Sequence, residues 1–166
     1  MKKIYILLMH TNTIPSKLIK FFTRYKYTHV GLSLDKSCNT IYSFGRKNLH
    51  SFIKGGFVIE NRDGAFFQTF NRTTCQVYEL SVTEEKYNSL KHILEEMVEN
   101  IQDYKYDFLG LIPRFFGIPV TTKNKYVCSF FVAEVLEKAE IIKFKKETCL
   151  VYPKDFSKRE ELSKVY

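Results

Sequence analysis

Glycine and proline are scarce in this sequence, with 7 and 4 residues, and no stretch is of low complexity. Because 45% of the residues are hydrophobic, this composition excludes a disordered or linker-rich chain and indicates a globular protein. Tryptophan is absent, but 15 phenylalanines and 11 tyrosines are present. We see no internal repeat, and a length of 166 residues suffices for one hydrophobic core. We therefore expect a single domain over residues 1–166.

Long apolar runs are also missing, which argues against a membrane-spanning helix. Lys2 and Lys3 followed by apolar residues 4–9 look superficially like a secretion signal. The run is short, however, and leads into polar residues 10–13 with no small-residue cleavage site. We therefore expect a buried first strand and a cytoplasmic protein.

Paired cysteines are lacking as well. The four cysteines are widely spaced, with no CxxC motif: Cys38, Cys75, Cys128 and Cys149. In a reducing compartment they should be thiols, one of which could be reactive. The cysteines and histidines lack the short paired spacings of zinc sites, and no glycine-rich phosphate loop occurs. We therefore expect no metal and no cofactor.

Hydrophobic periodicity predicts strands alternating with a few helices. Expected strands cover residues 3–9, 28–35, 40–46, 57–60, 74–82 and 148–152, with a turn at 36–39 joining the second and third. Expected helices cover residues 15–25 and 84–102, with a last one beginning near residue 128. Strands with helices set apart from them predict an α+β fold, in which an antiparallel sheet packs against helices.

Cys128 differs from the other cysteines because it follows a polar loop and opens an apolar helix. Unpaired backbone N–H groups and the helix dipole at that position lower a thiol pKa and can also hold an oxyanion. A small buried thiol without a catalytic role is the alternative interpretation. Tyr126 and Ser129, which flank Cys128, are the residues we expect in the oxyanion or substrate pocket.

His29 is the candidate base for Cys128. Its neighbours on the same strand face, Gly31 and Ser33, are small and would leave room for a helix N-terminus to approach the imidazole. A half-exposed histidine without function is the competing interpretation. A third group usually orients the imidazole of such a pair. We choose Ser43 on the next strand for this role, while Asn39, Asn48 and Glu60 are further candidates.

The segments around these residues resemble a known family. The segments are Thr28-His29-Val30-Gly31-Leu32-Ser33-Leu34-Asp35 and Tyr126-Val127-Cys128-Ser129-Phe130-Phe131-Val132-Ala133-Glu134. With the histidine hairpin before the cysteine helix, they resemble the circularly permuted NlpC-type papain-like cysteine hydrolases. That group includes YiiX-like and YebB-like proteins and, more distantly, lecithin–retinol acyltransferase-like enzymes. The resemblance implies a papain-like fold, Cys128 as nucleophile and His29 as base. It also implies a polar third residue on the strand after the histidine, often glutamate or histidine, whereas residues 41–46 contain neither.

The expected chemistry is hydrolysis of an amide or ester bond, in an amidase or peptidase, or acyl transfer by a lipid esterase or acyltransferase of the same fold. The substrate would be a small molecule, a peptide or a lipid, and the apolar segment 108–118 is a candidate wall for an acyl chain. A net charge of +8 and basic residues interleaved with aromatic ones at 17–27 and 143–146 leave another class open. This is a non-catalytic module that binds an anionic lipid or polymer. No motif for specific nucleic-acid binding is present.

Overall fold

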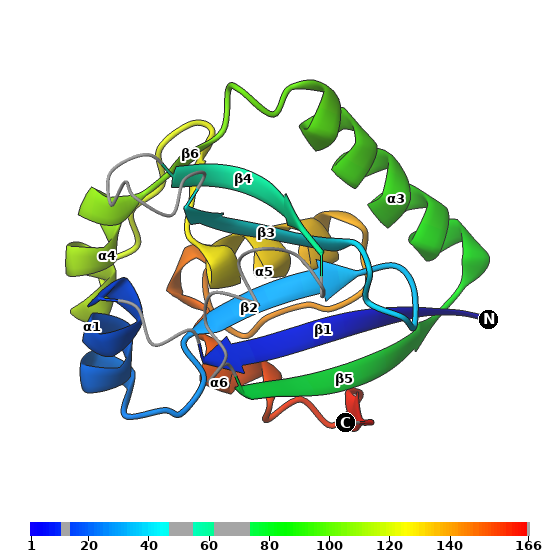
Figure 1. Cartoon of the computed structure of the whole chain (residues 1–166), viewed down its shortest axis with the longest axis horizontal. Helices are drawn as coiled ribbons and strands as arrows, with labels where there is room; N and C mark the ends of the chain where they lie inside the picture. The colour runs from blue at the N-terminus through cyan, green and yellow to red at the C-terminus, as the bar shows by residue number, and fades with distance from the viewer. Residues whose placement is uncertain (11–13, 47–54, 62–73, 166) are drawn as a thin grey trace.

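The computed structural model describes residues 1–10, 14–46, 55–61 and 74–165 (Figure 1). Its strands are β1 (Lys2–His10), β2 (His29–Ser33), β3 (Ile41–Arg46), β4 (Gly55–Glu60), β5 (Thr74–Val82), β6 (Lys105–Tyr106), β7 (Lys125–Tyr126) and β8 (Ser163–Lys164). Its helices are α1 (Ile14–Thr23), α3 (Glu84–Glu99), α4 (Phe108–Phe115), α5 (Cys128–Lys138), the 3₁₀ helix η1 (Thr148–Leu150) and α6 (Pro153–Phe156).

The described strands form one curled sheet in the order β7-β6-β4-β3-β2-β1-β5-β8. Every pair is antiparallel except β6 and β7, which are parallel. The predicted antiparallel sheet is therefore found, with one parallel pair at its end. Helices pack against the sheet, so the protein has the mixed α and β architecture that the strand and helix pattern predicts.

β1 lies in the middle of the sheet, between β2 and β5. Its residues 4–9 are apolar without interruption because both faces of the strand are covered. Ile4, Ile6 and Leu8 belong to the main hydrophobic core, and Tyr5, Leu7 and Met9 to a smaller cluster. The predicted buried first strand is therefore confirmed.

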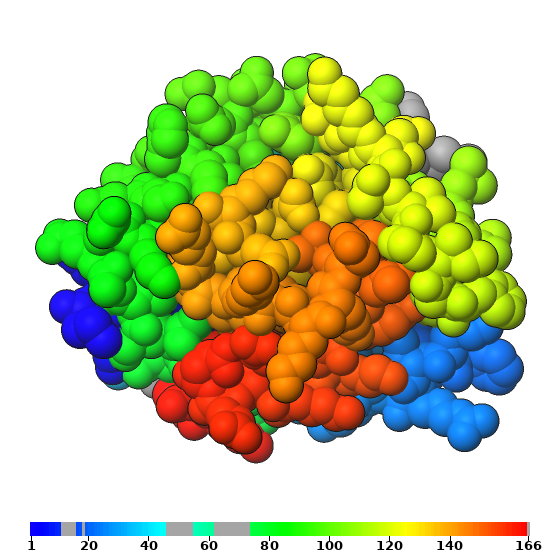
Figure 2. All heavy atoms as spheres, turned by 180° about the vertical axis from the view of Figure 1, so that it is seen from behind, coloured from blue at the N-terminus to red at the C-terminus, as the bar shows by residue number. Residues whose placement is uncertain are grey.

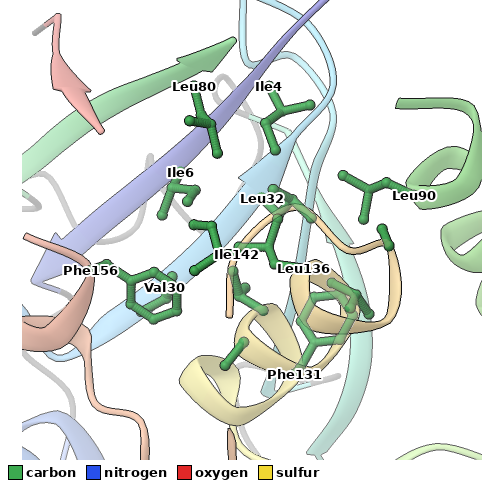
Figure 3. Packing of buried hydrophobic residues seen from close by; sticks show 14 of the residues in the cluster. Ile4, Ile6, Val30, Leu32, Leu80, Leu90, Phe131, Leu136, Ile142 and Phe156 are labelled. Atoms are coloured by element: carbon green, nitrogen blue, oxygen red, sulfur yellow. The ribbon is translucent and has the colours of Figure 1, made fainter. Parts of the chain in front are cut away.

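The main core lies between the sheet and α5 (Figure 3). Val30 and Leu32 of β2 face Phe131 and Leu136 of α5, and all four side chains are buried. Fully burying one such side chain stabilises the fold by roughly 1.5–3 kcal/mol. This packing holds α5 across β2 and β3, and it brings the first residue of the helix to the first residue of β2.

α3 is the predicted amphipathic helix. Thr83 caps it by accepting a hydrogen bond from the Lys86 backbone N–H. Leu90, Leu94 and Met97 are buried along one face. The helix covers one side of the core (Figure 1), and its Tyr87 hydroxyl donates to the Leu34 carbonyl just after β2 at 3.3 Å.

The predicted strand at 148–152 is wrong, because residues 148–150 form the 3₁₀ helix η1. The Leu150 and Val151 N–H groups donate to carbonyls three residues back. The Val151 carbonyl accepts from Ser129 Oγ of α5 at 2.6 Å. Backbone groups engaged locally and with a helix are not available to extend a sheet, which explains the failure of the β-rich pattern here.

Candidate active site

The structure brings His29 and Cys128 together from opposite ends of the sequence. His29 is the first residue of β2 and Cys128 the first residue of α5, and α5 packs against β2. The imidazole and the thiol lie close enough for each to shift the pKa of the other. Cys128 is 3% exposed, and the His29 side chain is 12% exposed. The two residues predicted as nucleophile and base therefore lie beside each other and interact electrostatically.

The N-terminus of α5 supplies donors to the Cys128 sulfur. Val127 is the N-cap residue, and among the described residues no side chain caps the helix there. The first bond within the helix runs from the Phe131 N–H to the Val127 carbonyl, which leaves earlier N–H groups for other acceptors. The backbone N–H groups of Ser129 and Val30 lie near the sulfur and help to lower the pKa of the thiol. A negative charge on the sulfur is stabilised at this position.

The site favours an ion pair over two neutral side chains. Burial opposes ionisation of Cys128, but the charge of His29, its hydrogen bond and the two backbone N–H groups together lower the thiol pKa. Burial also disfavours the charged imidazole, yet the thiolate and Glu60 together raise the pKa of His29 to about 10. Cys128 therefore loses its proton before His29 does, so a thiolate beside an imidazolium forms in preference to two neutral side chains.

Ser43 fixes the orientation of the imidazole by binding its Nε2 side. The Ser43 hydroxyl donates to the Val30 carbonyl at 2.7 Å and lies 3.1 Å from His29 Nε2. Since its one hydrogen is used on the carbonyl, Ser43 Oγ must accept the hydrogen bond from Nε2–H. Nδ1 is then the nitrogen that remains to exchange a proton with the sulfur. Ser43, our choice as third residue, lies beside the imidazole as expected.

Glu60 is also beside the imidazole. Its Oε2 lies 3.6 Å from His29 Nε2, a distance that suits an ion pair but is too long for a hydrogen bond. The Glu60 side chain is 9% exposed, and Oε2 has no hydrogen-bond partner among the described residues. Asn39, by contrast, is exposed in the turn after β2, and Asn48 lies outside the described residues.

Gly45, not Gly31, is the glycine beside the imidazole. A Cβ on Gly45 would lie 3.8 Å from His29 Cε1, whereas a Cβ on Gly31 would collide with Ile41 Cγ2. The expectation that Gly31 leaves space for a helix is therefore wrong, because Ile41 and Met9 fill that space. Ser33 is fully buried and bonds to Asp35, so it leaves no room either.

The two residues expected in the oxyanion or substrate pocket have different surroundings. Ser129 contributes its backbone N–H to the site, while its hydroxyl donates to Val151. The Tyr126 ring packs in an aromatic cluster, 5.2 Å from Phe44 and 4.7 Å from Phe130 between centroids. The Cys128 thiolate helps to raise the pKa of a different tyrosine, Tyr106, which no sequence pattern distinguishes.

Tyr106 remains a hydrogen-bond donor at any physiological pH. Burial first, then the Cys128 thiolate and Asp107, raise the pKa of Tyr106 well above its ordinary value, against the opposing charge of Arg114. A Cβ on Gly55, the facing residue, would lie 2.7 Å from Tyr106 Cβ. Glycine at position 55 therefore permits the close approach of Tyr106 to β4.

A buried ion pair supports α4, the helix that follows Tyr106. Arg114 donates to Asp107 Oδ2 at 2.7 Å and to the Val120 carbonyl, and its side chain is 2% exposed. Asp107 Oδ1 accepts from the Gly110 N–H at the start of the helix. The pair therefore connects both ends of α4 to the strand that carries Tyr106.

The state of the cysteines, a search for metal sites and membrane helices, and comparisons with known proteins complete the description of the site. The four cysteines, all within the described residues, are thiols. No cluster of three or more potential metal ligands occurs among the described residues, and no described helix is long and apolar enough to cross a membrane. Comparison with models of known protein families gives no match, and comparison with curated proteins gives none either. The function of the site is therefore inferred from its geometry.

Proposed function

We propose that the protein is a cysteine-dependent hydrolase acting on an amide or ester bond, with Cys128 as nucleophile and His29 as base. The observation that carries the proposal is the electrostatic pairing of Cys128 and His29, the first residues of α5 and β2, with Nε2 of the imidazole held by Ser43. A nucleophile, a base and an orienting group in series are the signature of covalent catalysis. A cysteine that acts as a small buried hydrophobe needs no such arrangement.

The proposal includes the fold family. A histidine on the strand of a hairpin, followed later in the chain by a cysteine at a helix N-terminus, is the order of the circularly permuted papain-like hydrolases. The curled sheet and α5 are compatible with that fold. The thiolate needs a reducing environment, and we place the activity in the cytoplasm for that reason.

The reaction follows from the resting ion pair. The Cys128 thiolate attacks the substrate carbonyl carbon, and the C=O bond electrons move to the oxygen. As the tetrahedral intermediate collapses, His29 donates its Nδ1 proton to the leaving amine or alkoxide, and a thioester with Cys128 remains. Water then attacks the thioester while His29 takes its proton, and the acid is released with regeneration of the ion pair.

We assign the stabilisation of the oxyanion to two groups. The backbone N–H groups at the start of α5 lie at the sulfur, and the Tyr106 hydroxyl is a permanent donor coupled to the same group. Losing one oxyanion donor costs roughly 10²–10³-fold in turnover in enzymes of this type. Ser43 and Glu60 act as positioning residues, because they orient the imidazole and stabilise its charge.

An acyl-enzyme experiment tests the proposal. The protein is mixed with p-nitrophenyl acetate, and the burst of p-nitrophenol is followed while intact and peptide masses locate the acetyl group. We expect one acetyl group per chain, on Cys128, and a burst that is slower by roughly 10²–10⁴-fold in His29→Ala. Acetylation at other sites only, or an equal burst in His29→Ala, would contradict the proposal.

Cys149→Ser is the matched control for this experiment. Cys149 is also buried, but burial raises the pKa of its thiol instead of lowering it. The burst should survive in Cys149→Ser and disappear in Cys128→Ser. The same pair of variants separates the hydrolase from a non-catalytic basic module, in which neither cysteine would carry an acyl group.

A further inference from the structure

An exposed apolar surface lies at one end of the molecule, where α1 and α4 meet. Phe22 of α1 stacks on Phe115 of α4 at 4.2 Å between ring centroids. Figure 1 shows the two helices side by side at that end, and Figure 2 shows the end of α1 and the α4 segment at one edge from behind. Large apolar side chains on this α1–α4 surface are 46–81% exposed: Phe21, Phe22, Leu109, Ile112, Phe116 and Ile118.

The exposed residues of α4 form an ordered stripe. Leu109, Ile112 and Phe116 are spaced three and four residues apart, so they share one helix face. The opposite face is formed by Gly110, Leu111 and Arg114, which are buried. Helices on the surface of a globular protein normally turn polar side chains to solvent. Here the outward face is apolar, and burying it requires a partner.

Charge identifies the partner of this surface. The chain contains 18 acidic residues, but none occurs in residues 1–34 or 108–133, which include both helices. The exposed cationic residues of α1 and of the segment after it are Lys17, Lys20, Arg24 and Lys26. Lys17 lies one helical turn before Phe21 and Lys20 one turn after Lys17, while Arg24 follows directly after the helix. The α1–α4 surface therefore combines exposed apolar side chains with positive charge and no negative charge of its own.

We propose that the α1–α4 surface docks the protein on an anionic lipid bilayer. Phe and Leu on one face with Lys and Arg beside them is the pattern of helices that lie in a membrane interface. Protein interfaces are depleted in lysine, which disfavours a protein partner. Aliphatic Leu109, Ile112 and Ile118 offer no stacking surface for bases, which disfavours a nucleic acid. Phe21 and Phe116 enter the acyl region, and the cationic residues meet the lipid headgroups.

The α1–α4 surface is close to the candidate active site in the sequence. Residues 24–28 alone separate α1 from His29, and α4 begins directly after Asp107, next to Tyr106. Docking by this end therefore brings the His29 end of β2 toward the bilayer. The docking proposal stands independently of catalysis, because Cys128 and His29 take no part in it.

Vesicle sedimentation tests the docking. The full chain is spun with phosphatidylcholine vesicles that contain either no phosphatidylglycerol or about one third of it, at low and at physiological salt. We expect binding to the anionic vesicles that weakens with salt. Phe21→Gln with Leu109→Gln and Phe116→Gln should abolish the binding. Lys17→Gln with Lys20→Gln should weaken it by on the order of tenfold or more, at about 1 kcal/mol per charge.

Matched variants elsewhere on the surface are the controls. Ile59→Gln replaces an exposed apolar residue of β4, and Lys145→Gln with Lys158→Gln removes two exposed charges from other segments. Both should bind like the wild type. Absence of binding at low salt, or equal losses in test and control variants, would overturn the proposal. A mass twice that of the chain, measured by light scattering and halved by the apolar triple variant, would also overturn it in favour of self-association.

Discussion

Replacing Glu60 by glutamine isolates the charge that the structure places behind His29. Glu60→Gln keeps the size and shape of the side chain and removes one negative charge 3.6 Å from His29 Nε2. At an effective dielectric constant of about 20, two unit charges at that distance interact by about 4.6 kcal/mol. Divided by about 1.4 kcal/mol per pKa unit, this gives about 3 units as an upper value. The imidazolium charge is spread over the ring, so we expect a fall of about 1–3 units from the value of about 10.

The assay for Glu60→Gln is an NMR titration of the His29 ring protons. Glu79→Gln is the matched control, because Glu79 is also a strand carboxylate but pairs with Lys3 at 2.7 Å. The control should leave the His29 pKa unchanged. The same change should lower stability near neutral pH by up to about 1.4 kcal/mol for each unit by which the His29 pKa falls, because the raised pKa stabilises the folded state. A His29 pKa equal to that of the wild type would refute the electrostatic role of Glu60.

Three further predictions concern the fold and the ion pair. Gly31→Ala should lower the free energy of unfolding in urea by about 1–3 kcal/mol, because the added Cβ collides with Ile41. Gly45→Ala is the control: its Cβ makes ordinary contacts of 3.5–3.8 Å, so stability should be unchanged or slightly higher. An equal loss of stability in both variants would show that the packing around Gly31 is wrong. Asp107→Asn should lower the free energy of unfolding in urea by about 3–5 kcal/mol, since it leaves the buried Arg114 guanidinium without its counterion. A decrease of less than about 1 kcal/mol would contradict the burial of this ion pair. Protonation of His29 stabilises the folded state below pH 6.5, and this contribution is lost as the pH rises to about 10, whereas ionisation of Cys128 adds stability as the pH rises to 9.0. Between pH 9.0 and about 10 only the loss of the His29 contribution remains, so the free energy of unfolding of the wild type should fall by about 1 kcal/mol more than that of the Cys128→Ser/His29→Gln variant. The same pH dependence of the unfolding free energy in both proteins would contradict the ion pair.

The pairing of His29 with Cys128 was predictable because each residue sits at a recognisable boundary. Alternating residues marked β2, an apolar stripe after a polar loop marked α5, and the starts of both elements were correct to within a residue or two. Since both elements contribute to one core, their first residues were candidates for contact. Ser43 followed from the hairpin, because its strand is the next one along the chain.

Other parts of the site depend on long-range contacts that periodicity does not encode. Glu60 lies on β4, and its approach to His29 depends on the β3–β4 register, in which Ile41 faces Glu60. Tyr106 lies on a two-residue strand, too short to give a pattern. The segment at 148–152 has strand-like composition but is tied to α5 by Ser129. Likewise, Gly31 suggests open space in the sequence, whereas Ile41 fills that space in the fold.

The pH dependence of Cys128 alkylation tests the central claim most directly. Iodoacetamide labelling is followed by peptide mass spectrometry, so that exposed Cys75 is counted separately, in the wild type and in His29→Ala. We predict rapid labelling of Cys128 well below the ordinary thiol pKa of about 8.5. In His29→Ala the titration should move above that value, because burial then acts without the opposing imidazolium. An ordinary thiol titration in the wild type, unchanged by His29→Ala, would contradict the ion pair and with it the proposed hydrolase.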